Sequence, residues 1–312
     1  MTTPTSHSVL VIGAASFDIK GFADGPMLPG TSNAGRVRRS LGGVARNVAE
    51  NLARLDVNVT LLTAVGDDFG GRQIMEQAAG CGVDTAPTIV VEGGRTGAYL
   101  AVLDENGNLS VAIDDMRIVE AITPRYLNDR RRLFAEASML AIDANLTPDA
   151  LNTIFNLAAK YNLPVCADPT STALADRLCL YLRQLHLIAP NAAEAAVLTG
   201  LPVARTQDEA REAARHLVAL GVDLAILTLA DQGSAYATSE ASGLVPAMRV
   251  DIVDPSGAGD ALTAATIFAV LNDIPTDEAV RLGVAAAALT LQSKETVAPE
   301  LSLEKLYAQL AP

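Results

Sequence analysis

Residues 253–271 read VDPSGAGDALTAATIFAVL, and in this stretch a glycine turn leads directly into an apolar helical pattern. Gly257 and Gly259 flank Ala258 and leave the backbone bare just where the helix should begin. Exposed N–H groups and the positive end of a helix dipole together favour a bound anion. The stretch therefore predicts an anion-binding turn, with Asp260 in the first turn of the helix.

Asp260 has two interpretations when its residue type and position are considered alone. A first-turn aspartate commonly does no more than complement the helix dipole, which stabilises an exposed helix by less than about 1 kcal/mol. Beside a phosphate, the same carboxylate accepts the proton of an attacking hydroxyl. The residues alone leave both interpretations open.

Outward from this stretch, short apolar runs alternate with amphipathic helical patterns along most of the chain. This alternation is typical of repeated βαβ units and predicts an α/β fold whose mostly parallel central sheet is covered by helices. The order is not strict, which leaves room for a mixed edge. Strands are expected at 8–13, 59–65, 138–144, 163–168, 185–190 and 223–229, and helices at 42–55, 148–161 and 208–220.

Two segments, about 17–40 and 95–115, do not fit the βαβ pattern. The second alternates in polarity on either side of Asn106-Gly107, a dipeptide that favours a tight hairpin turn. We expect the two segments to form a small β lid over the carboxyl edge of the sheet, within one domain that spans residues 1–312.

Composition and charge exclude several classes of function. The chain has 312 residues, of which 50% are hydrophobic, so it can bury a large core. With 36 acidic and 23 basic residues its net charge is −13, which argues against nucleic acid or an anionic membrane as a partner. The start of the chain has no signal-peptide pattern, and three widely spaced cysteines indicate reduced thiols. A cytoplasmic protein is expected.

Polar residues near the first strand and the first helix are candidates for a ligand site, because ligands of open α/β sheets bind at the carboxyl ends of the strands. Asp18 follows the first strand and could accept hydrogen bonds from two sugar hydroxyls, or cap a loop. Gly42 and Gly43, with Asn47 one turn later, allow close approach to a hydroxylated ligand, or form an ordinary tight turn.

Two further candidates follow later strands. Asn191 and Glu194 are three residues apart at a helix start, where they would form a capping box or organise magnesium and phosphate. Thr228 and Gly233 belong to a strand end and turn along which a nucleotide could lie, and a simple β-turn explains them equally well. No P-loop pattern appears, and no glycine fingerprint of a dinucleotide-binding domain follows the first strand.

Two motifs, in this order and spacing, resemble signatures of the ribokinase (PfkB) family of sugar and nucleoside kinases. GGVARNVAENLARL (42–55) is similar to its N-terminal glycine-pair signature, and DPSGAGDALTAATIFAVL (254–271) to its C-terminal one, with NAAE (191–194) between them. The resemblance covers roughly residues 8–310. It implies a ribokinase-like three-layer αβα sandwich with a β lid, and phosphoryl transfer from ATP with Mg²⁺.

The resemblance also implies roles for individual residues. Asp260 would be the catalytic base, and Gly257, Ala258 and Gly259 the anion hole. Asp254 and Ser256 match positions that hold a monovalent cation, so K⁺ is a further implied cofactor, although Pro255-Ser256 departs from the family pattern. The nucleotide would contact Asn191, Thr228, Gly233, Gly257 and Gly259, while Asn191 and Glu194 would organise Mg²⁺, partly indirectly.

Within the family, the glycine-pair stretch, AIDANLTPDAL (141–151) and CADPTST (166–172) resemble the members that phosphorylate the 5′-hydroxyl of the C-nucleoside pseudouridine. Alternatives are ribose, adenosine, inosine or a keto-deoxy sugar acid as substrate, and a non-catalytic sugar or nucleoside sensor. Exposed lid strands favour a homodimer through the lid. On the pseudouridine interpretation, Asp18, Gly42, Gly43, Asn47 and Asn145 would hold the ribose, and Thr96 and Tyr99 would face the base.

Overall fold

An eight-stranded sheet runs through the centre of the molecule, in the order β14-β13-β12-β11-β10-β9-β1-β4. The computed structural model describes residues 7–107 and 109–310, so the ends of the predicted domain, 1–6 and 311–312, lie outside the described residues. Six strands pair in parallel, and β13 and β14 add an antiparallel edge. The predicted mostly parallel α/β fold is confirmed. The strands are β1 (Ser8–Ile12), β4 (Asn58–Leu62), β9 (Met139–Asp143), β10 (Val165–Asp168), β11 (Leu187–Ile188), β12 (Leu224–Thr228), β13 (Ser234–Ala237) and β14 (Ser242–Val245).

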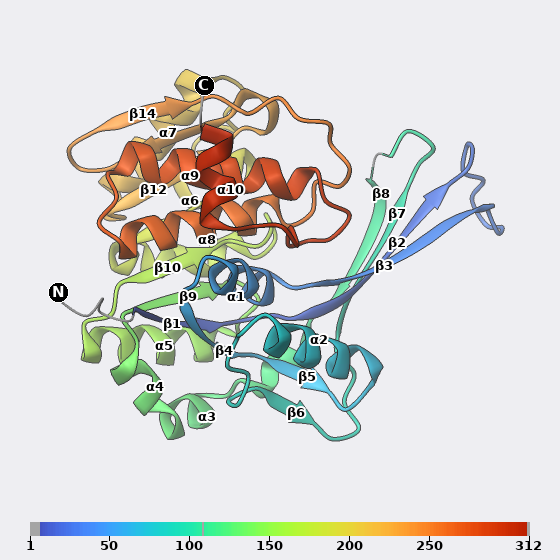
Figure 1. Cartoon of the computed structure of the whole chain (residues 1–312), viewed down its shortest axis with the longest axis horizontal. Helices are drawn as coiled ribbons and strands as arrows, with labels where there is room; N and C mark the ends of the chain where they lie inside the picture. The colour runs from blue at the N-terminus through green and yellow to red at the C-terminus, as the bar shows by residue number, and fades with distance from the viewer. Residues whose placement is uncertain (1–6, 108, 311–312) are drawn as a thin grey trace.

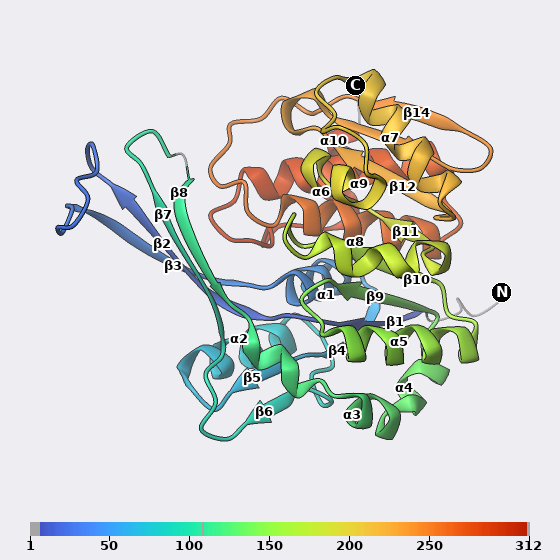
Figure 2. The same ribbon diagram turned by 180° about the vertical axis from the view of Figure 1, so that it is seen from behind.

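Helices cover both faces of this sheet (Figures 1 and 2). Alternate residues of a strand point to opposite faces, so Leu10 and Ile12 of β1 join one core cluster while Val9 and Val11 join the other. No helix among the described residues is both long and apolar enough to span a bilayer. The first face carries α3 (Pro124–Asp129), α4 (Arg131–Glu136), α5 (Pro148–Tyr161), α6 (Ala192–Thr199) and α7 (Gln207–Ala219), and the second carries α1 (Val44–Arg54), α8 (Ala258–Leu271), α9 (Thr276–Leu291) and α10 (Leu303–Leu310).

A second sheet of four strands projects from the body of the molecule (Figure 1). We call it the lid sheet; its order is β3-β2-β7-β8. It is built from the two segments that depart from the βαβ pattern. The strands are β2 (Ser16–Ala23), β3 (Gly35–Gly42), β7 (Gly97–Leu103) and β8 (Leu109–Asp115); a small pair, β5 (Ala64–Gly66) and β6 (Ile89–Val91), and α2 (Phe69–Gly80) lie near its base.

The two faces of the lid sheet differ in chemistry. The pairing aligns Asp18 of β2 with Tyr99 of β7, and Tyr99 with Asp114 of β8, so these three side chains form a row on one face. The opposite face is apolar and exposed, and includes Val37, Leu100, Val111 and Ile113. Asp18 is buried, whereas the apolar row is 43–69% exposed, so the polar face is the one turned toward the body.

Candidate active site

Carboxylates gather at the carboxyl edge of the central sheet. β9 ends at Asp143 and the neighbouring β10 ends at Asp168, and the two residues are in register. The N-termini of α1 and α8 begin at the same edge. Ligands of open α/β sheets bind at this edge, which makes it the candidate active site.

The glycine turn before α8 has the geometry of an anion site. Gly257 caps the helix with a left-handed φ of +82°, and a Cβ there would lie 1.9 Å from the carbonyl oxygen of Thr296. A Cβ at Gly259 would meet no other atom within 4 Å, so the space over it is open. The first helical hydrogen bond runs from the Ala261 N–H, 2.9 Å to the Gly257 carbonyl, which leaves the preceding amides, including that of Ala258, without a helical acceptor.

Asp260 lies beside these amides and is only 8% exposed. The Nδ2 group of Asn47 donates a hydrogen bond to its Oδ2, at 2.6 Å. Burial raises the pKa of Asp260 to about 6, the Asn47 hydrogen bond and Arg46 oppose this, and the carboxylates of Asp143 and Asp18 add to it. At neutral pH the side chain is therefore mostly ionised. Its pKa lies close to neutral pH, which suits a general base.

A buried cluster around Arg46 orients Asn47. The Arg46 guanidinium is 1% exposed and donates to Glu50 Oε1 at 2.8 Å, to Thr296 Oγ1 at 2.7 Å and to the amide oxygen of Asn47. Thr296 Oγ1 also lies 3.0 Å from that oxygen. With its oxygen held there, the amide of Asn47 turns its NH₂ group toward Asp260.

The glycine pair creates space for Asp18. A Cβ at Gly42 would lie 2.2 Å from Asp18 Oδ2, and one at Gly43, whose φ is +91°, would lie 2.4 Å from Ala15 Cα. Ser16 Oγ donates to Asp18 at 2.6 Å, and burial raises the pKa of Asp18. The pair therefore brings the start of α1 against the loop after β1 and leaves the Asp18 carboxylate beside it.

The other predicted substrate residues differ in their burial and in the hydrogen bonds that they already form. Tyr99 is half-buried in the polar row, and burial and the charges of Asp18 and Asp114 raise its pKa. Asn145 follows β9, and its backbone N–H donates to Asp143 at 3.0 Å. The hydroxyl of Thr96 donates to Asp68 at 2.5 Å and accepts the N–H of Gly66 at 3.0 Å. Contact between Thr96 and a base stays a prediction, and the Thr96 hydroxyl already has these two partners.

Asn191 and Glu194 form a complete capping box at the start of α6. Asn191 Oδ1 accepts the Glu194 N–H at 3.0 Å, and Glu194 Oε2 accepts the Asn191 N–H at 2.9 Å. Burial raises the pKa of Glu194, and burial and the charges of Asp260 and Glu194 raise that of Asp168 well above its usual value.

These carboxylates suit a magnesium ion that arrives with phosphates. The structure, over residues 7–107 and 109–310, has no cluster of three or more His, Cys, Asp or Glu side chains able to hold a metal by itself. Mg²⁺ commonly uses one or two carboxylates together with substrate phosphates and water. Oxygen atoms of Glu194 and Asp168 fit that pattern, so the capping and metal interpretations of Glu194 are compatible.

The predicted nucleotide turn is well defined. Thr228 ends β12, bridges to Asn191, and donates its N–H to the Pro190 carbonyl at 3.0 Å. Gly233 has a φ of +93°, and a Cβ there would lie 2.2 Å from the carbonyl oxygen of Val245. Gly233 is thus required by the turn itself, and its contact with a nucleotide stays a prediction.

Asp254 and Ser256, the predicted monovalent cation ligands, already have a cationic partner. Lys20 Nζ lies 2.9 and 3.0 Å from the two Asp254 oxygens and 2.5 Å from Ser256 Oγ. Arg38 also forms an ion pair with Asp254. With these oxygens engaged, the two residues do not fit a bound K⁺.

Sequence reasoning missed several residues of this region. Asp143 is fully buried and accepts the N–H groups of Ala14 at 2.7 Å and Ala45 at 3.1 Å, which ties the β1 loop to α1. A signal for Asp143 and Asp168 was present, because Asp168 ends the predicted strand 163–168 and Asp143 is one residue before the end of the predicted strand 138–144, at the edge where ligands bind. Lys20, Arg38, Arg46 and Asp114 gave no comparable local signal.

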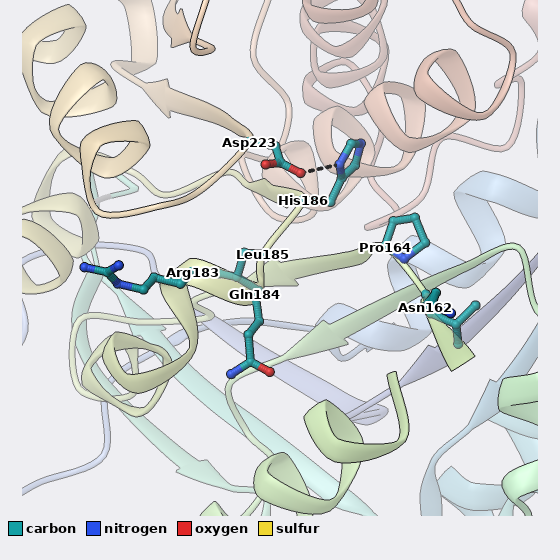
Figure 3. Close-up of a pocket in the computed structure, with 8 residues that line it drawn as sticks. Asn162, Pro164, Arg183, Gln184, Leu185, His186 and Asp223 are labelled. Carbon is teal, nitrogen blue, oxygen red and sulfur yellow. Dashed lines mark hydrogen bonds and ion pairs between the residues drawn. The ribbon is translucent and has the colours of Figure 1, made fainter. Parts of the chain in front are cut away.

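A surface hollow of about 300 Å³ lies away from this site (Figure 3). Its lining residues precede β10, β11 and β12, so it is at the amino edge of the sheet. It contains a His186–Asp223 pair with 2.9 Å between Nδ1 and Oδ2. It shares no residue with the carboxyl-edge site.

Comparisons with known proteins agree with this geometry. A family model described as "pfkB family carbohydrate kinase" matches residues 6–302. Pseudouridine kinase of Escherichia coli (strain K12) is 33% identical over 304 residues, which cover 96% of this chain and 95% of that protein. An uncharacterized sugar kinase of the same organism is also 33% identical, over 95% of this chain and 81% of that protein.

A solved structure supports the fold assignment. Ribokinase of Arabidopsis thaliana, complexed with ribose and ATP, matches with a TM-score of 0.86 at 22% identity, over 99% of this chain and 100% of that one. The predicted ribokinase-like sandwich is confirmed by this likeness.

Proposed function

The chain belongs to the pfkB family of carbohydrate kinases and is a phosphotransferase that acts on an alcohol group; on that premise we propose that it transfers the γ-phosphoryl group of ATP to the 5′-hydroxyl of a nucleoside, and that this nucleoside is pseudouridine. The observation that carries the proposal is a buried carboxylate that lies beside backbone N–H groups without a helical acceptor. Asp260, hydrogen-bonded to Asn47, lies one residue after the glycine turn Gly257–Gly259.

The proposed chemistry follows from that pairing. Asp260 accepts the proton of the 5′-hydroxyl while the oxygen attacks the γ-phosphorus, the bond from that phosphorus to the β–γ bridging oxygen breaks, and ADP leaves. The turn amides stabilise the charge on the transferring group. Mg²⁺, held with the nucleotide by Glu194 and Asp168, would offset the negative charge of the phosphates. ATP would lie along Asn191, Thr228 and Gly233, as the family resemblance implies.

The polar row of the lid sheet favours pseudouridine over uridine. Tyr99 lies between Asp18, which the resemblance assigns to the ribose, and Asp114, so Asp114 offers a carboxylate acceptor on the other side of the aromatic ring. Pseudouridine is linked through carbon and therefore keeps a ring N–H donor that uridine lacks. An acceptor-rich surface suits that additional donor, because an unpaired polar group in a site reduces affinity.

A substrate panel tests the proposal. With ATP and Mg²⁺, we expect phosphorylation of pseudouridine at a kcat/KM at least about a hundredfold above that of uridine, inosine or ribose, given the discrimination that hydrogen-bonding sites achieve. Phosphate transfer is measured by coupled ADP release and by mass spectrometry of the product. Activity on ribose with none on pseudouridine would contradict the assignment, and ligand binding without any transfer would indicate a sensor.

A second candidate is a kinase for a free sugar or another nucleoside. The sugar kinase that matches this chain at the same 33% identity favours it. On this alternative, Asp18 and Asn145 would hold sugar hydroxyls in the same way, and the lid row would contact no base. Ribose, adenosine, inosine and a keto-deoxy sugar acid therefore belong in the same panel.

We also propose a homodimer that pairs the apolar faces of two lid sheets. Val111 and Ile113 are 55% and 63% exposed, and burying such side chains is favourable. We expect light scattering to give twice the 32.4 kDa of one chain, and Ile113→Asp to give the single-chain mass. Leu180→Asp, at an 85% exposed leucine on the body, is the matched control that should leave the dimer intact. A wild-type mass of one chain contradicts the proposal.

A further inference from the structure

The loop before the glycine turn contains a buried carboxylate, Asp254, whose negative charge is balanced by cationic side chains of the protein. Asp254 is 5% exposed, and its Oδ1 accepts the N–H of Ser256 at 2.9 Å, which shapes the approach to Gly257. The backbone N–H groups of Val253 and Asp254 both donate to the Leu291 carbonyl, at 2.8 and 3.3 Å. A buried carboxylate at this point requires a positive partner.

Lys20 supplies that partner from the lid sheet. Its ammonium has three N–H donors, and three acceptors surround it: both oxygens of Asp254 and the hydroxyl of Ser256. The side chain is 7% exposed, so the contact is shielded from solvent. Burial and the nearby Arg38 lower the pKa of Lys20 to about 8, which still leaves the ammonium form predominant at neutral pH.

A second cation at this position is disfavoured. It would need the oxygens of Asp254 and Ser256 that Lys20 occupies. It would also lie beside the positive charges of Lys20 and Arg38, while Asp254 contributes a single negative charge. The oxygen atoms of Asp254 and Ser256 therefore fit the ammonium of a lysine and do not fit K⁺.

We propose that the Lys20 ammonium takes the place of a monovalent cation at Asp254 and Ser256, so that the glycine turn before α8 is ordered without K⁺. The consequence for turnover rests on the proposed kinase function, whereas the consequence for cation binding does not. Because Lys20 belongs to β2, the cation is delivered by the lid sheet and leaves the turn if that strand moves away.

Thermal unfolding without substrates tests cation binding directly. We compare the Tm in KCl, NaCl and choline chloride at equal ionic strength. The wild-type Tm should change by less than about 2 °C, because an ion that does not bind the folded state cannot stabilise it. Lys20→Met should melt lower in choline chloride, and KCl should restore part of the loss. Lys160→Met, at an exposed lysine of α5, should match wild type in every salt.

Initial rates with the substrate that the panel identifies give the second readout. Wild-type turnover should agree within about twofold among the three salts, and Lys20→Met in choline chloride should be about tenfold to a hundredfold slower, with partial recovery in KCl. A wild-type Tm that rises specifically with KCl, or wild-type turnover that requires K⁺, overturns the proposal. If the panel shows no transfer, the Tm comparison of wild type alone still decides it, and the kinase proposal fails separately.

Discussion

Asp260→Asn is expected to lower kcat by about 10²–10⁴-fold while the fold and ATP binding remain intact. The amide keeps the size of the side chain and can still pair with Asn47, and it cannot accept the proton of the attacking hydroxyl. Steady-state kinetics give the change in kcat, and calorimetric titration with ATP and thermal unfolding report on binding and stability.

Asp149→Asn is the matched control, because Asp149 is also a first-turn aspartate but lies exposed at the start of α5. It should leave kcat unchanged, which separates base catalysis from a helix-dipole effect. Near-wild-type kcat for Asp260→Asn would show that the base is elsewhere. The pH profile gives a further readout: since Asp260 accepts a proton only when ionised and its pKa is about 6, wild-type kcat/KM should fall as the pH drops through about 6. The residual activity of Asp260→Asn should lack that fall.

Arg46→Met is expected to lower the free energy of unfolding by about 3–5 kcal/mol, or the Tm by about 10 °C, because it leaves a buried charge without its partner. Glu50 is fully buried, and Gln77 Nε2 also donates to it, at 3.3 Å. Asn47 also loses the charged donor to its amide oxygen, so kcat should fall with stability. Thermal and urea unfolding measure the change.

Two comparison variants isolate the cause. Arg46→Met combined with Glu50→Gln removes both charges and should recover part of the lost stability. Arg132→Met removes an exposed Arg–Glu pair with the same four-residue spacing and should leave the Tm unchanged. If the Tm of Arg46→Met equals that of the wild type, the buried ion pair has no role in stability. The orientation of Asn47 then needs another explanation.

The sequence supported the fold to the extent that local patterns determine it. Apolar periodicity marked the parallel strands and their covering helices, and the Asn106-Gly107 dipeptide marked the hairpin of the lid sheet. Gly257 could be placed at the start of α8 because a bare turn followed by an apolar helix is a local pattern. The capping box of Asn191 and Glu194 is local as well.

The contacts of the site were beyond local pattern because they join distant parts of the chain. Lys20 and Asp254 are 234 residues apart, and Asn47 and Asp260 are 213 apart. Only the packing of α1 against α8, and of the lid sheet against the loop before α8, creates these pairs. Arg46 appeared as one of several helical arginines, since nothing near it in sequence showed that it would be buried.

Strand β2 carries Asp18 and Lys20 two residues apart, on the same face and about 6.6 Å apart along the strand. Asp18 is the residue proposed to hold the nucleoside, and Lys20 contacts Asp254 and Ser256 in the loop that precedes the glycine turn. The acceptor side and the phosphate side of the proposed site therefore share one strand, and a substitution that shifts β2 would disturb both together.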